Sequence, residues 1–174
     1  AISGQTVSRY IDLLCDLMLV RRLPAWHGNV GKRLIRSPKV YVRDSGLVHA
    51  LLGLSNLDAV LSHPVAGSSW EGFVIEQLIN AAPQAQASFY RTSNGAEVDL
   101  VLTFRNQQTW TIEIKRSSAP TVSKGFYQAA TDLGAARKLL VAPVEHTYPM
   151  KEGIEVVDVM TAIHLVAQQD QHTD

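Results

Sequence analysis

Two apolar stretches near the middle of the chain carry charged residues whose spacing could do chemistry: Asp99 in EVDLVL, and Glu113 and Lys115 in TIEIK. A hairpin closed by FRNQQT near Asn106 would set Asp99 opposite Glu113, with Lys115 on the same side two residues further on. The same alternation predicts one face made of Val98, Leu100 and Leu102 and another made of Glu97, Asp99 and Val101. We therefore expect the two acids and the lysine to meet.

Carboxylates placed so close together repel each other, and a half-buried pair is tolerated only with a proton or a cation between them. Oxygen ligands of this kind suit Mg²⁺ or Mn²⁺, which bind through one or two carboxylates plus substrate phosphate. Such an ion activates a bound water and neutralises charge on a phosphodiester, and Lys115 would add a cation for the same purpose. The pattern predicts hydrolytic chemistry.

A third acid comes from the segment SSWEGFVIEQLI, which has helical spacing. Glu71 shares its helix face with Val74, Ile75 and Leu78, the side expected to pack on the sheet. Glu76 falls on another face. We therefore expect Glu71 at the site and Glu76 in solvent.

A simpler interpretation stays open for these residues. The hairpin face could be wetted by solvent and hold an ordinary cross-strand salt bridge, and Glu71 could lie at the rim of its helix face. Arg91 and Gln128 could reach the site from an adjoining strand and helix, or could be plain surface residues.

The elements that must position these residues can be read from the periodicity of apolar side chains. "HPVAGSS" is the best candidate for a boundary. It divides the chain into an N-terminal helical segment (1–66), a domain with the charged hairpin (67–168) and a polar, frayed tail (169–174). The expected helices are 8–20, 46–54, 56–61, 70–81, 122–134 and 161–168, and the expected strands of the second part are 87–92, 96–104, 109–115, 137–142 and 154–158.

Basic residues gather between the first helix and residue 43, where no carboxylate intervenes before Asp44. A helix followed by a basic hairpin has the outline of part of a winged helix, which would bind phosphates without sequence choice. The alternative is a solvated face that pairs with acids elsewhere. The candidate nucleic-acid-binding residues are Arg21, Arg22, Lys32, Arg33, Arg36 and Lys39.

The composition is that of a soluble globular protein, with 46% apolar and 18% charged residues and a formal net charge of zero. A charge balance of this kind gives no overall attraction to nucleic acid or membrane. The lone Cys15 excludes an internal disulfide, and no apolar run approaches a membrane span, so we expect a cytoplasmic protein without a membrane partner. The chain begins with alanine, and we expect it to be a piece of a longer polypeptide.

The ordered motifs "SSWEGFVIEQL", "GAEVDLVL" and "IEIK" resemble the PD-(D/E)xK nuclease-like fold. The resemblance implies a restriction-endonuclease-like mixed sheet flanked by helices, in the order helix, three strands, helix, strand over 67–142. It implies Asp99 and Glu113 as metal ligands, the carbonyl of Ile114 as another, Lys115 serving the water and Glu71 supporting the metal. One departure is Val98, where the superfamily's name has proline.

A closer resemblance covers most of the chain. "TVSRYIDLLCDLMLVRRLPAW" and "GKRLIRSPKVYVRDSGLVHALLG", followed by the motifs above, are similar to the domain of unknown function that follows the ATPase module in a large family of prokaryotic AAA+ ATPases. It implies an upstream ATPase in the same polypeptide and does not imply cleavage. We expect a Mg²⁺-dependent or Mn²⁺-dependent nuclease-like domain acting on DNA. The alternative is a catalytically silent module that binds nucleic acid or protein.

Overall fold

A six-stranded mixed sheet forms the centre of the second part of the chain. The structure, a computed structural model, describes residues 3–28 and 31–172. The strands are β3 (Gln86–Arg91), β4 (Glu97–Thr103), β5 (Thr109–Ile114), β6 (Arg137–Val141), β7 (Tyr148–Pro149) and β8 (Ile154–Val157). They lie in the order β3-β4-β5-β6-β8-β7, antiparallel from β3 to β5, parallel from β5 through β6 to β8, and antiparallel again at β7. The predicted mixed sheet is confirmed, although the short β7 was not predicted.

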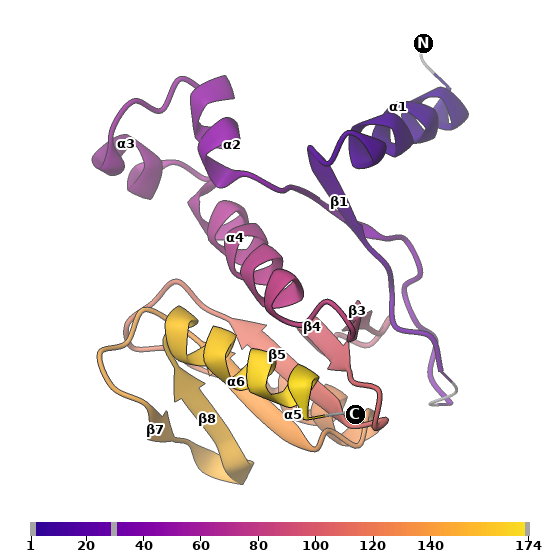
Figure 1. Ribbon diagram of the computed structural model, residues 1–174, viewed down its shortest axis with the longest axis vertical. Coiled ribbons are helices and arrows are strands. Elements are labelled where there is room, and N and C mark those ends of the chain that lie inside the picture. Colours follow the sequence, from indigo (N-terminus) through magenta and orange to yellow (C-terminus); the bar gives the residue numbers. More distant parts are fainter. Residues whose placement is uncertain (1–2, 29–30, 173–174) are drawn as a thin grey trace.

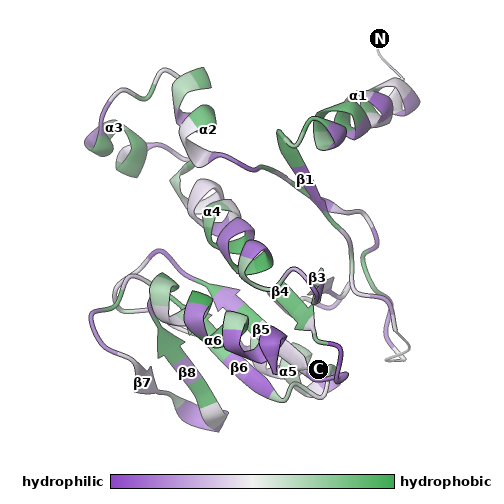
Figure 2. Cartoon of the chain, viewed as in Figure 1, coloured by the Kyte–Doolittle hydropathy of each residue, from purple (hydrophilic) through white to green (hydrophobic). Residues whose placement is uncertain are grey.

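Helices cover both faces of this sheet (Figure 1). Side chains of α4 (Ala66–Ala81) and α6 (Val159–Gln171) pack on one face, where Val74, Ile75 and Val166 join Leu100 and Ile112 in one buried cluster. On the other face α5 (Lys124–Asp132) contributes Phe126 and Ala129 to a second cluster. Figure 2 shows hydrophobic stretches in β4 and β8 and a mixture of hydrophobic and hydrophilic residues in β5 and β6. The prediction of helices flanking a mixed sheet is therefore confirmed.

The N-terminal part begins with α1 (Gly4–Asp16), which starts earlier than the predicted 8–20 because the Ser3 hydroxyl caps it by accepting from the Thr6 N–H. A hairpin of β1 (Val20–Leu23) and β2 (Lys39–Val42) follows, then α2 (Ser45–Leu51) and α3 (Leu57–Ser62). Bridges Ala25–Phe89 and Leu34–Thr92 join the segment between β1 and β2 to the edge strand β3 and to Thr92, the residue that follows it. The predicted helix and basic hairpin are present, and backbone bridges from the segment between β1 and β2 connect the hairpin to the sheet.

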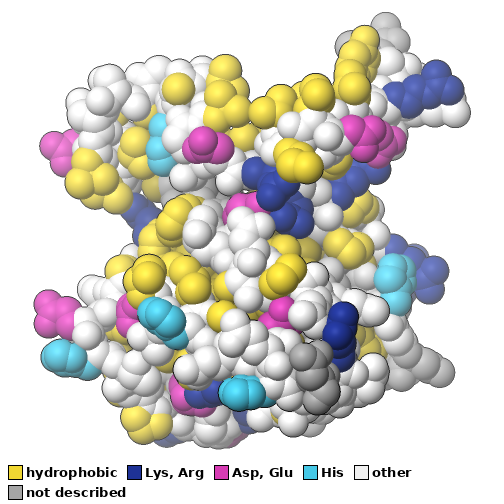
Figure 3. Space-filling model, in the orientation of Figure 1, with side chains coloured by type: hydrophobic (Ala, Val, Ile, Leu, Met, Phe, Trp, Pro, Cys, Tyr) yellow, Lys and Arg dark blue, Asp and Glu magenta, His cyan; other side chains and the backbone are white. Residues whose placement is uncertain are grey.

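The N-terminal helices leave apolar side chains in contact with solvent. No residue of α1 is buried, and Tyr10, Leu13 and Leu17 are exposed, as are Leu51 and Leu57 of α2 and α3. Figure 3 shows apolar side chains gathered over both regions. The apolar spacing that predicted α1 correctly therefore does not place this helix in the core of the described residues.

A bulge interrupts the pairing of β3 with β4 at Asp99. Ser88 pairs with Val101 but Tyr90 pairs with Val98, so β4 has one extra residue between these two pairs. As a result Val98 packs with Val101 in the α5 cluster while Leu100 packs in the α4 cluster. The prediction that Val98 shares one face of the strand with Leu100 and Leu102 is therefore wrong. The bulge reverses the side on which the residues beyond it point.

The predicted frayed tail is also wrong over most of its described length. α6 continues to Gln171, and the side chain of Asp170 is buried, where its Oδ2 accepts a hydrogen bond from the Gln84 N–H at 3.2 Å. A polar sequence is held in place here by a contact with the turn that follows α4, which is distant in the chain. Residues 173 and 174 lie outside the described residues. No helix in the described part of the chain is long and apolar enough to cross a membrane.

Candidate functional site

The β4–β5 hairpin has the predicted register. Leu100 pairs with Ile112 and Thr103 with Thr109, which centres the hairpin at Asn106. The paired residues end at Leu100, and beyond it the Ile114 N–H donates to Oδ2 of Asp99 at 3.0 Å. The bulge and this bond together fix Asp99 where the strands leave their regular ladder, with only 9% of the residue exposed.

Glu113 and Lys115 lie beside this point. Glu113 is buried, and its Oε1 is 2.5 Å from Nζ of Lys115. The backbone of Lys115 is held from both sides, since its N–H donates to the Val141 carbonyl and its carbonyl accepts from the Trp70 indole at 3.0 Å. The end of β5 is thus tied to β6 and to α4, so the lysine side chain starts from a rigid backbone.

Glu71 reaches the same place from α4. Its Oε1 accepts a hydrogen bond from the Tyr41 hydroxyl at 2.6 Å and lies 3.1 Å from Nζ of Lys39. Lys39 and Tyr41 are two residues apart in β2, so both point to the same side of that strand. The helix before the sheet and the N-terminal hairpin therefore meet at one carboxylate.

Lys39 contacts more than Glu71. Its Nζ is 3.3 Å from Oε1 of Glu97 and 3.5 Å from Oδ1 of Asp99, and only 21% of its side chain is exposed. One ammonium thus lies among three carboxylates. The site contains the acids Glu71, Glu97, Asp99 and Glu113 and the two lysines Lys39 and Lys115.

Burial and mutual repulsion shift the acids of this site. Burial, then the charge of Glu71, raises the pKa of Asp99 against the opposing effect of Lys39. Burial and the charge of Asp99 raise the pKa of Glu113 to about 7, although Lys115 acts in the opposite direction. Burial alone would lower the pKa of Lys39, but Glu71 and Asp99 outweigh it and raise that pKa. The site is short of positive charge.

A divalent cation would supply the positive charge that this site lacks, and carboxylate oxygens are ligands that such an ion binds. Four carboxylates face two ammonium groups, with Arg91 offsetting part of the charge at the exposed rim, 3.5 Å from Glu97. Asp99 and Glu113 supply the hard oxygens that Mg²⁺ prefers. Among the residues described, however, no three His, Cys, Asp or Glu side chains are grouped closely enough to hold a metal ion. The fit is therefore to a site with two carboxylates that needs further oxygens from backbone, water or substrate.

The prediction that Glu76 lies in solvent is wrong. It is buried, and its carboxylate receives hydrogen bonds from Arg21 at 2.5 and 2.9 Å and from Arg43 at 2.6 Å. Burial opposes the charged form, but the two guanidinium groups lower the pKa of Glu76 below its ordinary value. Helical spacing placed this residue away from the sheet, and the hairpin covers that side of α4.

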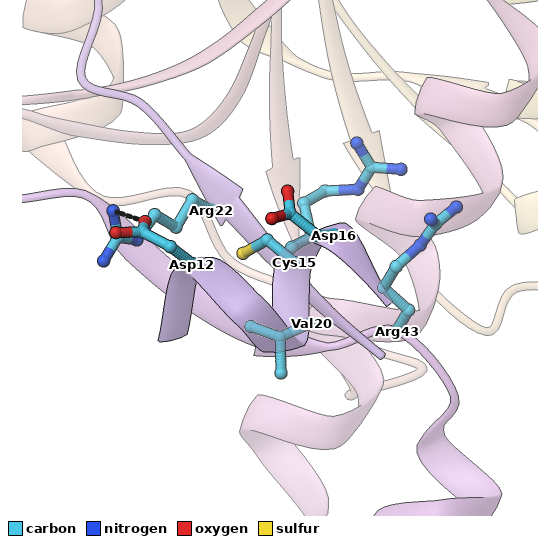
Figure 4. A pocket seen from close by; sticks show the side chains of 7 residues that line it. Asp12, Cys15, Asp16, Val20, Arg22 and Arg43 are labelled. Atoms are coloured by element: carbon cyan, nitrogen blue, oxygen red, sulfur yellow. Dashed lines mark ion pairs between the residues drawn. The ribbon is translucent and has the colours of Figure 1, made fainter. Parts of the chain in front are cut away.

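Most of the candidate nucleic-acid-binding residues are engaged in ion pairs with acids of the same chain. Arg21 pairs with Glu76, Arg22 with Asp12, Lys32 with Asp132, and Lys39 with the acidic site. Figure 4 shows the Arg22–Asp12 pair in a cavity of about 440 Å³ lined by Asp12, Cys15, Asp16, Val20, Arg21, Arg22 and Arg43. Arg33 and Arg36 are exposed. Arg33 and Arg36 are therefore the most accessible of the six candidate nucleic-acid-binding residues.

Gln128 and Arg91 differ in their relation to the acids. Gln128 donates to Oδ1 of Asp132 at 2.9 Å, in a group of side chains that also includes Lys32 and Tyr90, and contacts no acid of the site. Arg91 reaches Glu97 at the rim. Only Arg91 of the two predicted accessory residues therefore borders the site.

Sequence reasoning missed Tyr41, Glu97 and Trp70 as residues of this site and gave Lys39 a different role. Strand alternation did place Glu97 on the same face as Asp99, and the spacing of Lys39 and Tyr41 places these two on one side of β2. Nothing in that spacing says which carboxylates they face, because the contact joins residues 30 and 60 positions apart in the chain.

Two family models match the chain. Residues 66–162 match a domain of unknown function designated DUF4143, and residues 1–58 match another, DUF8612. Two mycobacterial proteins described only as uncharacterized, Rv2008c of Mycobacterium tuberculosis and Mb2031c of Mycobacterium bovis, are each 40% identical over 156 residues. The matched segment is 90% of this chain and 35% of each relative, so the chain spans about a third of their length.

Two solved structures have a weaker likeness. One is a half-complex of Thermococcus gammatolerans McrB AAA+ hexamers with bound McrC, with a TM-score of 0.42 and 8% identity over 97% of this chain and 66% of that one. The other is protein VC1899 from Vibrio cholerae, with a TM-score of 0.38 and 15% identity over 99% and 45%. Both TM-scores are below 0.5, and neither likeness bears on the site. By the match over 66–162, which contains every acid of the site, the chain belongs to the DUF4143 family of domains of unknown function.

Proposed function

We propose that this domain is a nuclease-like module that binds one divalent cation, Mg²⁺ or Mn²⁺, and hydrolyses a nucleic-acid phosphodiester. The observation that carries the proposal is the convergence of Asp99, Glu113 and Lys115 where β4 and β5 leave their ladder, with Glu71 reaching in from α4. The order of α4, β3, β4, β5, α5 and β6 agrees with that expected of a PD-(D/E)xK nuclease-like domain.

In this proposal Asp99 and Glu113 hold the cation, and the carbonyl of Ile114 completes the protein's share of the ligands. The bound cation supplies an activated water and neutralises charge on the phosphodiester. Lys115, already 2.5 Å from Glu113, orients the water and stabilises the developing negative charge. Glu71 holds Lys39 and Tyr41 beside Asp99 and so shapes that side of the site.

The test is to titrate Mn²⁺ into the protein and to incubate plasmid and single-stranded DNA with it. Wild type is compared with Asp99→Ala and with Glu145→Gln, which removes an exposed carboxylate outside the site. We expect saturable binding and cleavage by wild type and by the Glu145 variant, and loss of both with Asp99→Ala. Absence of Mn²⁺ binding to wild type, or cleavage that survives in Asp99→Ala, would contradict the proposal.

A second candidate function is a binding module without cleavage, and Lys39 favours it. Its ammonium already neutralises part of the charge of Glu71, Glu97 and Asp99, which is what a purely structural acidic cluster needs. On this alternative the exposed Arg33 and Arg36 contact nucleic acid or an acidic protein surface. Saturable Mn²⁺ binding without cleavage, or DNA binding that persists in Asp99→Ala, would support the module.

We also infer that the domain works beside an ATPase module. The motifs resemble those of domains that follow an AAA+ ATPase, and the match to DUF4143 agrees with that resemblance. The matched segment is only 35% of each mycobacterial relative, which leaves room for an ATPase module in the rest of their length. The measurement is to fuse this chain to the rest of a full-length relative and compare its ATP hydrolysis with and without DNA. We expect the two activities to be coupled.

A further inference from the structure

Lys39 occupies the middle of the carboxylate cluster although it comes from the N-terminal hairpin. Its Nζ lies 3.1 Å from Glu71, 3.3 Å from Glu97 and 3.5 Å from Asp99. These three acids belong to α4 and β4, and the lysine belongs to β2. Its ammonium thus does in the folded chain what a bound cation would do: it reduces the repulsion between acids that are held in place by other elements.

The position of this ammonium is fixed by the structure around it. The register of β2 is set by pairing of Lys39 with Leu23 and of Tyr41 with Arg21. Tyr41 binds the same oxygen of Glu71 that Lys39 contacts, and Nζ of Lys39 lies 5.6 Å from the centre of the Phe89 ring. A lysine with only 21% of its side chain exposed and these partners is not a freely moving surface cation.

We propose that Lys39 is a built-in cation of the acidic site and competes with a divalent ion for Asp99. The inference rests on the proposed metal site and adds its regulation: the ion binds when Lys39 withdraws, and any movement of the β1–β2 hairpin changes the affinity of the site. Oδ2 of Asp99 accepts from the Ile114 N–H, and Lys39 faces Oδ1, the oxygen left for an ion. The ammonium and a divalent ion at this oxygen repel each other, so each weakens the binding of the other. The hairpin thereby lowers the affinity for a divalent ion of the same site to which it contributes Lys39.

The test measures Mn²⁺ affinity by calorimetry for wild type, Lys39→Met, Lys39→Arg and Lys32→Met. Lys32→Met is the matched control, because Lys32, in the segment between β1 and β2, is also an ion-paired lysine, but its partner is Asp132 outside the site. Methionine keeps the length of the lysine side chain and removes the charge. We expect Lys39→Met to bind Mn²⁺ at least about tenfold more tightly than wild type, and Lys39→Arg and Lys32→Met to bind no more tightly than wild type.

Each outcome decides between the inference and the function on which it rests. Tighter binding by Lys39→Met than by wild type supports the inference. Binding by this variant alone supports competition by Lys39 but overturns the proposed function of the wild-type protein. Equal or weaker binding by Lys39→Met, with wild type still binding, overturns the inference and leaves the metal site standing. No binding by either protein overturns both.

A double variant keeps the test decisive if Lys39→Met does not fold. Glu97→Gln removes the most exposed carboxylate that contacts Lys39, one that the proposed metal site does not use, so Lys39→Met/Glu97→Gln leaves less uncompensated charge. It is compared with Glu97→Gln alone. Tighter Mn²⁺ binding by the double variant supports competition by Lys39, and equal binding overturns it.

Discussion

The backbone N–H of Ile114 donates a 3.0 Å hydrogen bond to the side chain of Asp99, just past the last pair of the β4–β5 ladder. A carboxylate thus takes the place of a strand carbonyl at the point where the bulge on β4 turns it out of the regular alternation. One residue thereby ends the ladder and faces the acidic site, so its structural role and its charge can be separated by substitution.

Asp99→Asn should separate them. The asparagine oxygen can still accept from Ile114, and burial already disfavours the charged form of Asp99, so we expect the free energy of unfolding to change by less than about 1 kcal/mol. The loss of the charge should weaken Mn²⁺ binding at least about tenfold. Urea unfolding and calorimetric titration of the two proteins measure these effects, and unchanged Mn²⁺ affinity would exclude Asp99 as a ligand.

Glu113 should make stability depend on pH in the direction opposite to that of a salt-bridged acid. Its pKa is about 7 in the folded protein, against about 4.3 for an unperturbed glutamate in the unfolded chain. Between these values the folded state binds more protons, so the free energy of unfolding falls as pH rises through this window. The raised pKa of Asp99 acts in the same direction.

The measurement is urea unfolding in EDTA at about pH 5 and about pH 7.5 for wild type and Glu113→Gln. We expect wild type to lose on the order of 2 kcal/mol between these conditions and the variant to lose clearly less, because glutamine does not titrate. Glu145→Gln, which changes an exposed acid, should keep the wild-type dependence. A variant with the full wild-type dependence would show that Glu113 is not the titrating group.

The sequence predicted the parts of this site that depend on local pattern. The hairpin centred at Asn106 follows from the turn residues and strand alternation, and the inward face of α4 with Glu71 follows from its spacing to Val74 and Leu78. These features are set by residues close together in the chain. Element bounds differ by a few residues where a capping side chain, such as Ser3, decides the start of a helix.

The parts that the sequence did not predict depend on contacts between distant segments. Glu76 is buried only because β1 and β2 bring Arg21 and Arg43 over that side of α4, and Lys39 faces acids rather than solvent for the same reason. A run of basic residues has the same pattern whether it binds phosphate or the chain's own carboxylates. The bulge that redirects Asp99 likewise leaves no mark in the apolar alternation.

Gly125→Ala should test the close approach of α5 to the loop before β4. A Cβ at this position would lie 2.4 Å from the carbonyl oxygen of Gly95, a backbone atom that cannot rotate away. We expect the variant to lose about 1–3 kcal/mol of stability, because the helix and the loop must move apart. Gly67→Ala is the control in the first turn of α4, where nothing lies within 4 Å, and it should be neutral or slightly stabilising. Thermal unfolding compares them, and equal melting temperatures for the two variants would contradict the predicted clash.

Glu76→Ala should reveal how strongly the N-terminal hairpin is fastened to α4. The substitution leaves Arg21 and Arg43, which share this buried carboxylate, facing each other without a counter-charge, and we expect a loss of about 3 kcal/mol. Glu155→Ala removes a more exposed pair with Arg137 and should cost less than about 1 kcal/mol. Because the pKa of Glu76 is lowered, its contribution is present above the unfolded pKa and is lost as pH falls through the folded one. Urea unfolding at neutral pH measures the difference between the two variants; a Glu76 variant no less stable than the Glu155 variant would mean that the arginines find other partners.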